Sequence, residues 1–270
     1  MAGKKIVVIT GANTGIGLET VKSLLRSKNK YHIWLGGRDL RKAQDAAHAS
    51  SSSLLSSALD SRTSSSVEPF QVDVESDLSI ENAYRRISIE SPRIDCLVNN
   101  AGASFDAHIR QDKITARAAW NKTWAVNVTG SHLMTTTFLP LLVKSRDPRL
   151  LFLTSGLSSL AEASDLGDSK NAAPRSGVPE YFPSYRASKT GLNMMMLDWH
   201  KALVNNNVKV WSVAPGFLAT SLGGDTEYLK RLGAGDPSTG GEFVRKVIEG
   251  ERDEDVGKVV RGYKSSIQPW

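Results

Sequence analysis

Cysteine is nearly absent from this chain. Cys96 is the only cysteine in 270 residues, so no intrachain disulfide can form. A disulfide-stabilised secreted scaffold is thereby excluded, and a reducing compartment is favoured. The strand-like run Lys4–Ile9 follows almost directly on Met1, which leaves no room for a signal peptide. We therefore expect a cytoplasmic protein in which Cys96 is buried and inert.

Long hydrophobic runs, metal-ligand patterns and dense basic stripes are also lacking. The longest mostly apolar stretch, His132–Val143, contains three threonines and is too short to span a bilayer. No Cys, His or Asp residues stand at metal-ligand spacing, so we expect no metal, and we interpret His108, His132 and His200 as structural. The net charge of +6 suits an anionic small ligand, whereas the absence of a basic stripe argues against nucleic acid as a partner. A membrane partner is not expected either.

Short β-branched runs alternate with longer amphipathic segments. This alternation predicts an α/β fold, a doubly wound parallel sheet of about seven strands with helices on both faces. The near-continuous apolar run Ile6–Ile9 is typical of a strand buried on both faces. No linker or repeat divides the chain, so we expect a single domain over residues 1–270. The expected strands are Lys5–Thr10, His32–Gly36, Val67–Val72, Ile94–Asn99, Leu150–Thr154, Val208–Val213 and Lys258–Val260, with helices near 16–27, 39–48, 77–90, 112–145, 184–205 and 238–249.

Two segments depart from this pattern. Residues 50–66 are rich in serine, which competes with the helical backbone for hydrogen bonds, so we expect a frayed helix end and a surface excursion. Residues 157–184 are rich in glycine, proline, serine and acids, and a connection of this length is more often functional or disordered than idle. We expect residues 157–184 and 217–235 to form loops over a substrate site.

A glycine-rich turn with the spacing G-x-x-x-G-x-G joins the first expected strand to the first helix. Glycines let the backbone approach a pyrophosphate closely, and the helix N-terminus offers free N–H groups and a positive dipole end. A tight turn without a ligand is the alternative, but the strand before it and the helix after it favour a nucleotide site. The candidate cofactor-binding residues here are Gly11, Asn13, Thr14, Gly15, Ile16 and Gly17.

The second expected strand ends in Gly36-Gly37-Arg38-Asp39. Near this point an acid binds the ribose 2′-hydroxyl of NAD, whereas an arginine accommodates the 2′-phosphate of NADP. We predict that Arg38 binds the phosphate and that Asp39 caps the following helix. NADP(H) is therefore the expected cofactor.

The third and fourth expected strands also end in candidate cofactor contacts. Asp73, followed by Val74, is suited to accept from an adenine amino group, or else to cap the next helix, for which Asp77 is better placed. The run Asn99–Gly102, which includes Asn100 and Ala101, is small enough to let a cofactor lie against the backbone at the carboxyl edge of the sheet.

Tyr185 and Lys189 stand four residues apart, so on a helix their side chains share one face. A phenol alone is a poor acid or base at neutral pH, because its ordinary pKa is about 10. An ammonium beside it favours the phenolate and makes proton transfer easier. The pair by itself is weak evidence, since this spacing occurs by chance on many helices, and its surroundings decide.

Several short motifs follow one another along the chain: Thr10-Gly11-x-x-x-Gly15-x-Gly17, Asp73-Val74, Asn99-Asn100-Ala101-Gly102, Asn127, Ser155, Tyr185-x-x-x-Lys189, Pro215-Gly216 and Thr220. In this order they resemble the motifs of classical single-domain short-chain dehydrogenases/reductases. The resemblance covers residues 10 to about 220 and implies a Rossmann-like fold and hydride transfer. The last fifty residues resemble the family only loosely.

The resemblance also implies a role for each matching residue. Tyr185 would donate a proton to a carbonyl oxygen, or accept one from an alcohol, and Ser155 would hydrogen-bond that oxygen. Lys189 would lower the pKa of Tyr185 and hold the nicotinamide ribose, and Asn127 would hold a water in a proton relay. The residues implied to contact the cofactor are Asp73, Val74, Asn100, Ala101, Gly102, Tyr185, Lys189, Pro215, Gly216 and Thr220. As alternatives, Ser155 is a mere turn former and Asn127 a kinked or hydrogen-bonded structural residue in a helix.

The predicted function is NADPH-dependent reduction of a ketone or aldehyde to an alcohol. The substrate is expected to be apolar, cyclic or aromatic, since aromatic and leucine side chains are expected around the cleft, among them Phe105, Tyr181, Phe182, Leu222 and Tyr228. The alternatives are an NAD-dependent alcohol dehydrogenase and a redox-inactive or repurposed nucleotide-binding member of the fold. Relatives of this kind are often dimers or tetramers, and the sequence does not decide between a homodimer and a homotetramer.

Overall fold

A computed structural model describes residues 3–56, 65–165, 182–263 and 266–270. Within these residues, seven strands form one parallel sheet: β1 (Lys5–Ile9), β2 (Tyr31–Gly37), β3 (Ser66–Gln71), β4 (Cys96–Asn99), β5 (Arg149–Leu153), β6 (Lys209–Ala214) and β7 (Val259–Arg261). Their order across the sheet is β3-β2-β1-β4-β5-β6-β7, which confirms the predicted class. The direction of winding reverses between β1 and β4, and in such sheets a ligand crevice opens outside the carboxyl ends at this point.

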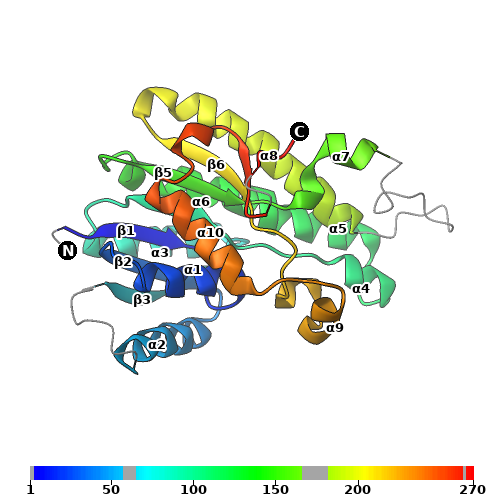
Figure 1. The fold of residues 1–270 in the computed structure, drawn as a ribbon, viewed down its shortest axis with the longest axis horizontal. Coiled ribbons are helices and arrows are strands. Elements are labelled where there is room, and N and C mark those ends of the chain that lie inside the picture. The colour runs from blue at the N-terminus through cyan, green and yellow to red at the C-terminus, as the bar shows by residue number, and fades with distance from the viewer. Residues whose placement is uncertain (1–2, 57–64, 166–181, 264–265) are drawn as a thin grey trace.

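Helices cover both faces of the sheet (Figure 1). One face carries α1 (Gly15–Leu25), α2 (Leu40–Ser56) and α10 (Pro237–Glu249), and the other carries α3 (Asp77–Glu90), α5 (Ala116–Trp124), α6 (Ser131–Leu142) and α8 (Pro183–Leu203). Three short helices gather beyond the carboxyl ends of the strands, at the right of Figure 1: α4 (Asp106–Arg110), α7 (Leu160–Ser164) and α9 (Thr226–Arg231).

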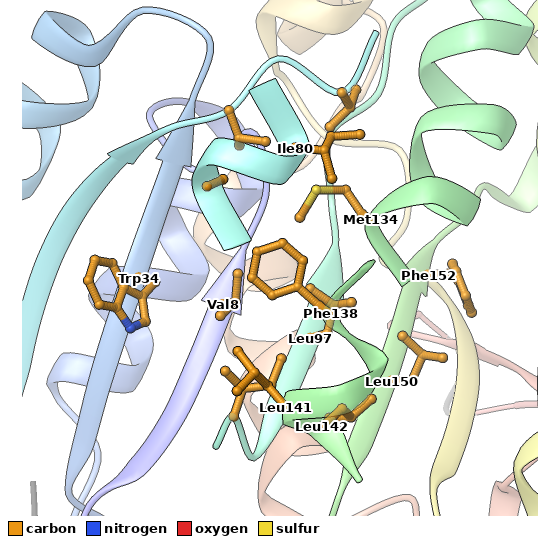
Figure 2. Packing of buried hydrophobic residues seen from close by; sticks show 14 of the residues in the cluster. Val8, Trp34, Ile80, Leu97, Met134, Phe138, Leu141, Leu142, Leu150 and Phe152 are labelled. Atoms are coloured by element: carbon orange, nitrogen blue, oxygen red, sulfur yellow. The ribbon is translucent and has the colours of Figure 1, made fainter. Parts of the chain in front are cut away.

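Successive side chains of the strands point to opposite faces of the sheet and pack into two separate hydrophobic cores. In β1, Ile6 and Val8 pack with the first cluster, while Val7 and Ile9 pack with the second, and all four are fully buried. Figure 2 shows the first cluster, in which Phe138 of α6 lies among side chains of the sheet and of α3. Each such side chain contributes about 1.5–3 kcal/mol of transfer free energy, so both layers of helices are held firmly against the sheet.

Two predicted segments differ from expectation. The helix expected over 112–145 is divided, because the π-helical turn η1 (Ala125–Gly130) separates α5 from α6. The helix α2 does not fray at residue 50 but continues to Ser56. The hydroxyls of Ser50 and Ser51 donate to the carbonyls of Ala46 and Ala47 at 2.7 and 3.0 Å, so these serines bond within the helix instead of competing with it.

Residues 157–165, the first part of the segment 157–184, are less irregular than predicted. The chain after β5 forms a 3₁₀ turn, η2 (Gly156–Ser158), and then the short helix α7. The remaining part, residues 166–181, lies outside the described residues, as do residues 57–64 of the serine-rich stretch. Tyr181 therefore cannot be placed, whereas Phe182 immediately precedes α8.

The predicted helix caps are partly right. Asp39 caps α2, because its Oδ1 accepts from the N–H groups of Arg41 and Lys42 at 2.9 and 3.2 Å. The expected cap at Asp77 is wrong, since Ser76 occupies the capping position of α3 and its hydroxyl accepts from the Ser79 N–H at 3.3 Å. Asp77 is instead the first helical residue, where its negative charge favours the positive end of the helix dipole.

Within the described ranges, no helix is long and apolar enough to cross a bilayer.

An ionic cluster lies at the amino ends of β5 and β6, opposite the carboxyl edge. The Arg149 guanidinium is almost fully buried and contacts the carboxylates of Asp147 and Asp253 at 3.0 and 2.6 Å. Lys209 contacts the same two carboxylates at 2.9 and 2.6 Å. Hydrogen bonds from Arg149 lower the pKa of Asp253 to about 2. The cluster thereby ties the start of two central strands to the segment before β7.

We predict that Asp253→Asn removes part of the acid sensitivity of the fold. The folded-state pKa of Asp253 is depressed, so its carboxylate stabilises the protein above the ordinary value of 3.8, and this contribution is lost as the pH falls toward 2. The expected loss is about 1 kcal/mol at neutral pH after allowance for solvent screening. Urea unfolding at neutral and acid pH measures it. The exposed neighbour Glu254 provides the control Glu254→Gln, and an equal effect of both substitutions would contradict the assignment.

Candidate active site

The glycine turn lies at the carboxyl end of β1, and its glycines let neighbouring chain segments pack closely against its backbone. Gly11 and Gly15 adopt φ angles of +60° and +56°, which side-chain-bearing residues rarely adopt. A Cβ on Gly11 would lie 2.9 Å from the Cα of Ala101, and a Cβ on Gly17 would collide with the Nδ2 of Asn100. The predicted glycines are therefore required by the packing of the turn against the segment that follows β4.

That segment braces the turn through hydrogen bonds. The Asn100 Nδ2 donates to the carbonyls of Thr10 and Gly11 at 2.8 and 3.0 Å. The N–H groups of Asn100 and Ala101 both donate to the Thr10 hydroxyl, at 3.1 and 3.0 Å. The side chain of Asn100 thus shapes the cofactor turn, and a contact between the backbone of this segment and the cofactor stays a prediction. The Thr10 hydroxyl thus accepts two of these hydrogen bonds. In the sequence, only its position next to Gly11 indicates this role.

The start of α1 presents uncapped N–H groups. Thr14 occupies the capping position without a side-chain hydrogen bond, and the first turn contains no acid. A Cβ on Gly15 would lie 3.5 Å from the Cγ2 of Thr220, so the segment from Pro215 and Gly216 to Thr220, which follows β6, passes over the turn. An uncapped helix start with a glycine approach suits an anionic group, so these residues fit the pyrophosphate of a dinucleotide.

The other predicted cofactor residues lie along the same edge. Arg38 is exposed immediately after β2, and its carbonyl accepts from Gln71 Nε2 at 3.3 Å. The Asn13 Oδ1 lies 3.1 Å from the position that a Cβ on Gly37 would occupy, next to Arg38. The Asp73 Oδ1 accepts from the Glu75 N–H at 3.1 Å in a local turn. Ile16 lies in the first turn of α1, and Val74 packs against Gly130.

Asn127 lies in the π-helical turn and is completely buried. Its Oδ1 accepts from the Ala103 N–H at 2.8 Å, and its Nδ2 donates to the Ala103 carbonyl at 2.9 Å. The same Nδ2 donates to the Ser188 hydroxyl at 2.8 Å, and that hydroxyl donates to the Tyr185 carbonyl at 2.7 Å. The side chain therefore connects the exit of β4 with α8. A hydrogen-bonded structural asparagine, which we considered as an alternative, occurs here within a π-helical interruption of the helix.

The start of α8 is capped from a distant part of the chain. Phe182 precedes the helix in a left-handed conformation without a side-chain cap, and Pro183 occupies the first helical position. The buried carboxylate of Asp106 accepts from the N–H groups of Ser184 and Tyr185 at 3.0 and 3.1 Å. Asp106 thus replaces the missing local cap and fixes the turn that carries Tyr185. Our sequence reasoning missed it, because nothing in the sequence relates residues 78 positions apart.

Tyr185 and Lys189 share one face of α8, as their spacing predicts. The Lys189 Nζ lies 5.7 Å from the centroid of the Tyr185 ring and donates to the Leu153 carbonyl at 2.7 Å. A Cβ on Gly102 would lie 3.4 Å from this amine and 3.3 Å from Asn127 Oδ1. The backbone after β4 therefore passes directly beside the lysine.

The pKa values of the pair follow from burial. Burial raises the pKa of Tyr185 to about 12, and a hydrogen bond with the Ser155 side chain lowers it by less. Burial lowers the pKa of Lys189 to about 7. We expected Lys189 to lower the pKa of Tyr185, but burial raises this pKa and the lowering contribution comes from Ser155. The reason is that the lysine amine is directed to the Leu153 carbonyl and is itself desolvated.

Ser155 is separated from β5 by Thr154 and caps the turn η2. Its Oγ accepts from the Leu157 N–H at 3.2 Å, so it is a turn former as well as a partner of Tyr185. The end of this one strand thus contacts both Tyr185 and Lys189, through Leu153, Thr154 and Ser155. The structure brings together Asn127, Ser155, Tyr185 and Lys189, which come from three separate motifs of the sequence.

The histidines interpreted as structural lie among aromatic side chains. The ring of His132 is 5.4 Å from that of Trp199, and the ring of His108 is 5.7 Å from that of Phe105. Among the described residues, no group of three or more His, Cys, Asp and Glu could hold a metal ion.

We predict that Lys189→Met increases stability and that the gain shrinks with rising pH. In the folded protein the pKa of Lys189 is about 7, below the ordinary value of 10.5. Between these two pH values the folded chain has released a proton that the unfolded chain still keeps. The stability of the unsubstituted protein therefore rises with pH relative to the variant. Thermal unfolding at about pH 6 and about pH 9 measures this. The control is Lys201→Met on exposed α8 surface, and equal gains for Lys189→Met at both pH values would refute the prediction.

Comparison with known proteins identifies the family. Residues 5–228 match the family model described as short chain dehydrogenase. The chain is 42% identical to the short-chain dehydrogenase/reductase eupG of a Phoma species, over 100% of this chain and 99% of the relative. It is also 42% identical to the short-chain dehydrogenase/reductase tropE of Talaromyces stipitatus, over 96% of both chains.

Solved structures share the same fold at lower identity. An NADPH-bound carbonyl reductase from chicken fatty liver aligns with a TM-score of 0.78 and 21% identity over 99% of both chains. A complex of Pseudomonas aeruginosa RhlG with NADP aligns with a TM-score of 0.76 and 21% identity over 96% of this chain and 95% of that chain. The family match, the two close relatives and the shared sheet order agree, and the chain belongs to the short-chain dehydrogenase/reductase family of oxidoreductases.

Proposed function

We propose that this protein reduces a ketone or aldehyde to an alcohol with NADPH. The observation that carries the proposal is the half-buried phenol of Tyr185, which lies next to Ser155 and Lys189 at the same edge of the sheet as the uncapped start of α1. A carbonyl oxygen bound between the two hydroxyls would receive a hydrogen bond from Ser155 and a proton from Tyr185. The RhlG complex and the NADPH-bound carbonyl reductase, which share the fold, support this reading.

The electrostatics favour Tyr185 as a proton donor. Because its pKa is raised to about 12, the phenol keeps its proton at neutral pH and can give it to a carbonyl oxygen. The phenolate left behind would be stabilised by Ser155 and by the protonated amine of Lys189, whose charged form a neighbouring phenolate favours. Bound NADPH would supply the hydride for the carbonyl carbon. The oxidation of an alcohol uses the same groups in reverse.

The cofactor would be held along the carboxyl edge. Gly11, Gly15 and Gly17 would accommodate its pyrophosphate at the start of α1, and Arg38 would bind the 2′-phosphate. Gly102 gives access to Lys189, which would then exchange its bond with the Leu153 carbonyl for the ribose hydroxyls. Asp73, Val74, Pro215, Gly216 and Thr220 line the same edge and would complete the site. Asn127 would act by fixing α8, and a water relay through it stays a prediction.

An apolar substrate is proposed from the surface around the site. The segments that follow β5 and β6 expose large apolar side chains: Leu157, Leu160, Phe217, Leu222, Tyr228 and Leu232. Exposed apolar groups on segments at a ligand-binding edge indicate contact with an apolar molecule. We therefore propose a cyclic or aromatic carbonyl compound as the substrate class, in a single-domain enzyme of the cytoplasm.

We predict that Tyr185→Phe abolishes most of the reduction while NADPH still binds. Loss of a general acid costs about 10²–10⁴-fold in rate, whereas the phenyl ring preserves the packing of α8. A panel of cyclic, aromatic and aliphatic carbonyl compounds, followed by NADPH consumption, measures turnover, and NADPH fluorescence measures binding. Equal turnover by the variant and the unsubstituted protein would show that the proton comes from another group.

We predict that Arg38→Asp reverses the cofactor preference. The substitution replaces a cation by an anion where the 2′-phosphate would lie, so NADPH should bind about 100-fold more weakly or worse, while NADH should be little affected. Titration of both dinucleotides measures the two dissociation constants. Arg26→Asp, the same charge change at the exposed far end of α1, is the matched control. Unchanged NADPH binding in Arg38→Asp would overturn the assignment.

A further inference from the structure

The last residues of the chain fold back against the active-site segment. The N–H of Arg261, the last residue of β7, donates to the Ser266 carbonyl at 3.1 Å, and the N–H of Gln268 donates to the Val259 carbonyl at 2.9 Å. The tail therefore returns antiparallel along β7, with a bridge between Val260 and Ile267. This return buries Gln268, which is only 1% exposed, although its neighbours on both sides are exposed. The family match ends at residue 228, so none of the motifs described above includes this tail.

The amide of Gln268 binds the segment of the proposed catalytic serine. Its Nε2 donates to the Ser155 carbonyl at 3.3 Å and to the Ser158 hydroxyl at 2.9 Å. The same Ser155 carbonyl accepts from the N–H and the hydroxyl of Ser158, at 3.1 and 2.6 Å. Three donors thus converge on one carbonyl, and they fix the peptide plane from which the Ser155 side chain projects.

Ser158 extends this network to α8. Its hydroxyl accepts from Asn193 Nδ2 at 2.9 Å and from the Thr154 hydroxyl at 3.2 Å. Its carbonyl accepts from the Thr190 hydroxyl at 3.0 Å. Gln268 therefore holds Ser155 in register with the helix that carries Tyr185 and Lys189.

Arg261 fixes the orientation of the Gln268 amide. The guanidinium is 5% exposed, and its Nε donates to the Gln268 Oε1 at 3.4 Å. Its Nη2 also pairs with the Glu162 carboxylate of α7 at 2.7 Å. With its oxygen bound to a cation, the amide must direct its NH₂ group toward Ser155 and Ser158. The Trp270 carbonyl accepts from the Ala161 N–H, which adds a second link between the tail and α7.

We propose that Gln268 is a positioning residue that orients the Ser155 hydroxyl for the reduction. This inference rests on the proposed role of Ser155. A buried amide that donates to the carbonyl of a catalytic residue restricts its backbone, and a misplacement of about 1 Å at a reacting group can cost about 100-fold in rate. A purely structural role would lower stability without acting through Ser155.

A double-mutant cycle distinguishes these roles. Gln268→Leu should lower kcat about tenfold or more while the NADPH dissociation constant stays unchanged. In a Ser155→Ala background the same substitution should change kcat by less than about twofold, because the hydroxyl that it orients is gone. Gln44→Leu on the exposed surface of α2 is the matched control and should leave kcat unaltered. Equal losses of kcat in both backgrounds, or no loss in either, would overturn the proposal.

A second variant and a second readout keep the test independent of folding and of activity. Gln268→Glu preserves size and the acceptor for Arg261 but cannot donate to the Ser155 carbonyl, and it should reproduce the kinetic effect. In both variants the amides of Leu157 and Ser158 should exchange with deuterium at least about tenfold faster, while those of β5 keep their protection. Unchanged exchange at these amides would refute the positioning role even if no carbonyl substrate is turned over. Absence of any turnover by the unsubstituted protein would refute the proposed function alone.

Discussion

A parallel sheet directs the carboxyl ends of all its strands to one edge, and the active site of this protein depends on that constraint. Thr10 after β1, Asn99 and Asn100 at β4, Ser155 after β5 and Pro215 after β6 meet there although they are far apart in the sequence. The helix that contributes Tyr185 and Lys189 crosses the sheet behind them. Each of these strands is therefore followed by one short polar segment at the site, and the buried cores hold these segments in place.

The polar groups behind the site are buried, and most of them have partners within the protein. Asn127 bonds the backbone of Ala103 and the hydroxyl of Ser188, and Asp106 bonds two N–H groups of α8. A buried network of this kind specifies one arrangement, because an unpaired member would cost about 1–3 kcal/mol. Lys189 is the costly member of the group, since burial opposes its charge. The site thus gives up stability for a lysine that its proposed chemistry needs.

The sequence predicted the sheet and the chemical groups well, because both are encoded locally. Apolar runs such as Ile6–Ile9 identify strands buried on both faces, and the spacing of Tyr185 and Lys189 identifies a shared helix face. The division of the helix at Ala125–Gly130 was not foreseen, because a π-helical turn is decided by tertiary bonds of Asn127. Asp106 and the pKa values of the pair were missed for the same reason: each depends on burial and on partners distant in sequence.

The π-helical turn can also be regarded as a one-residue insertion. A π-helical turn holds one extra residue locally, so removal of one residue between Ala125 and Gly130 would leave a more regular α-helix with α5 and α6 in nearly the same register. The widened turn that places the Asn127 amide against Ala103 and Ser188 would be lost. Within this region length is therefore as restrictive as composition: substitutions can be absorbed by repacking, whereas a single-residue deletion would uncouple the exit of β4 from α8.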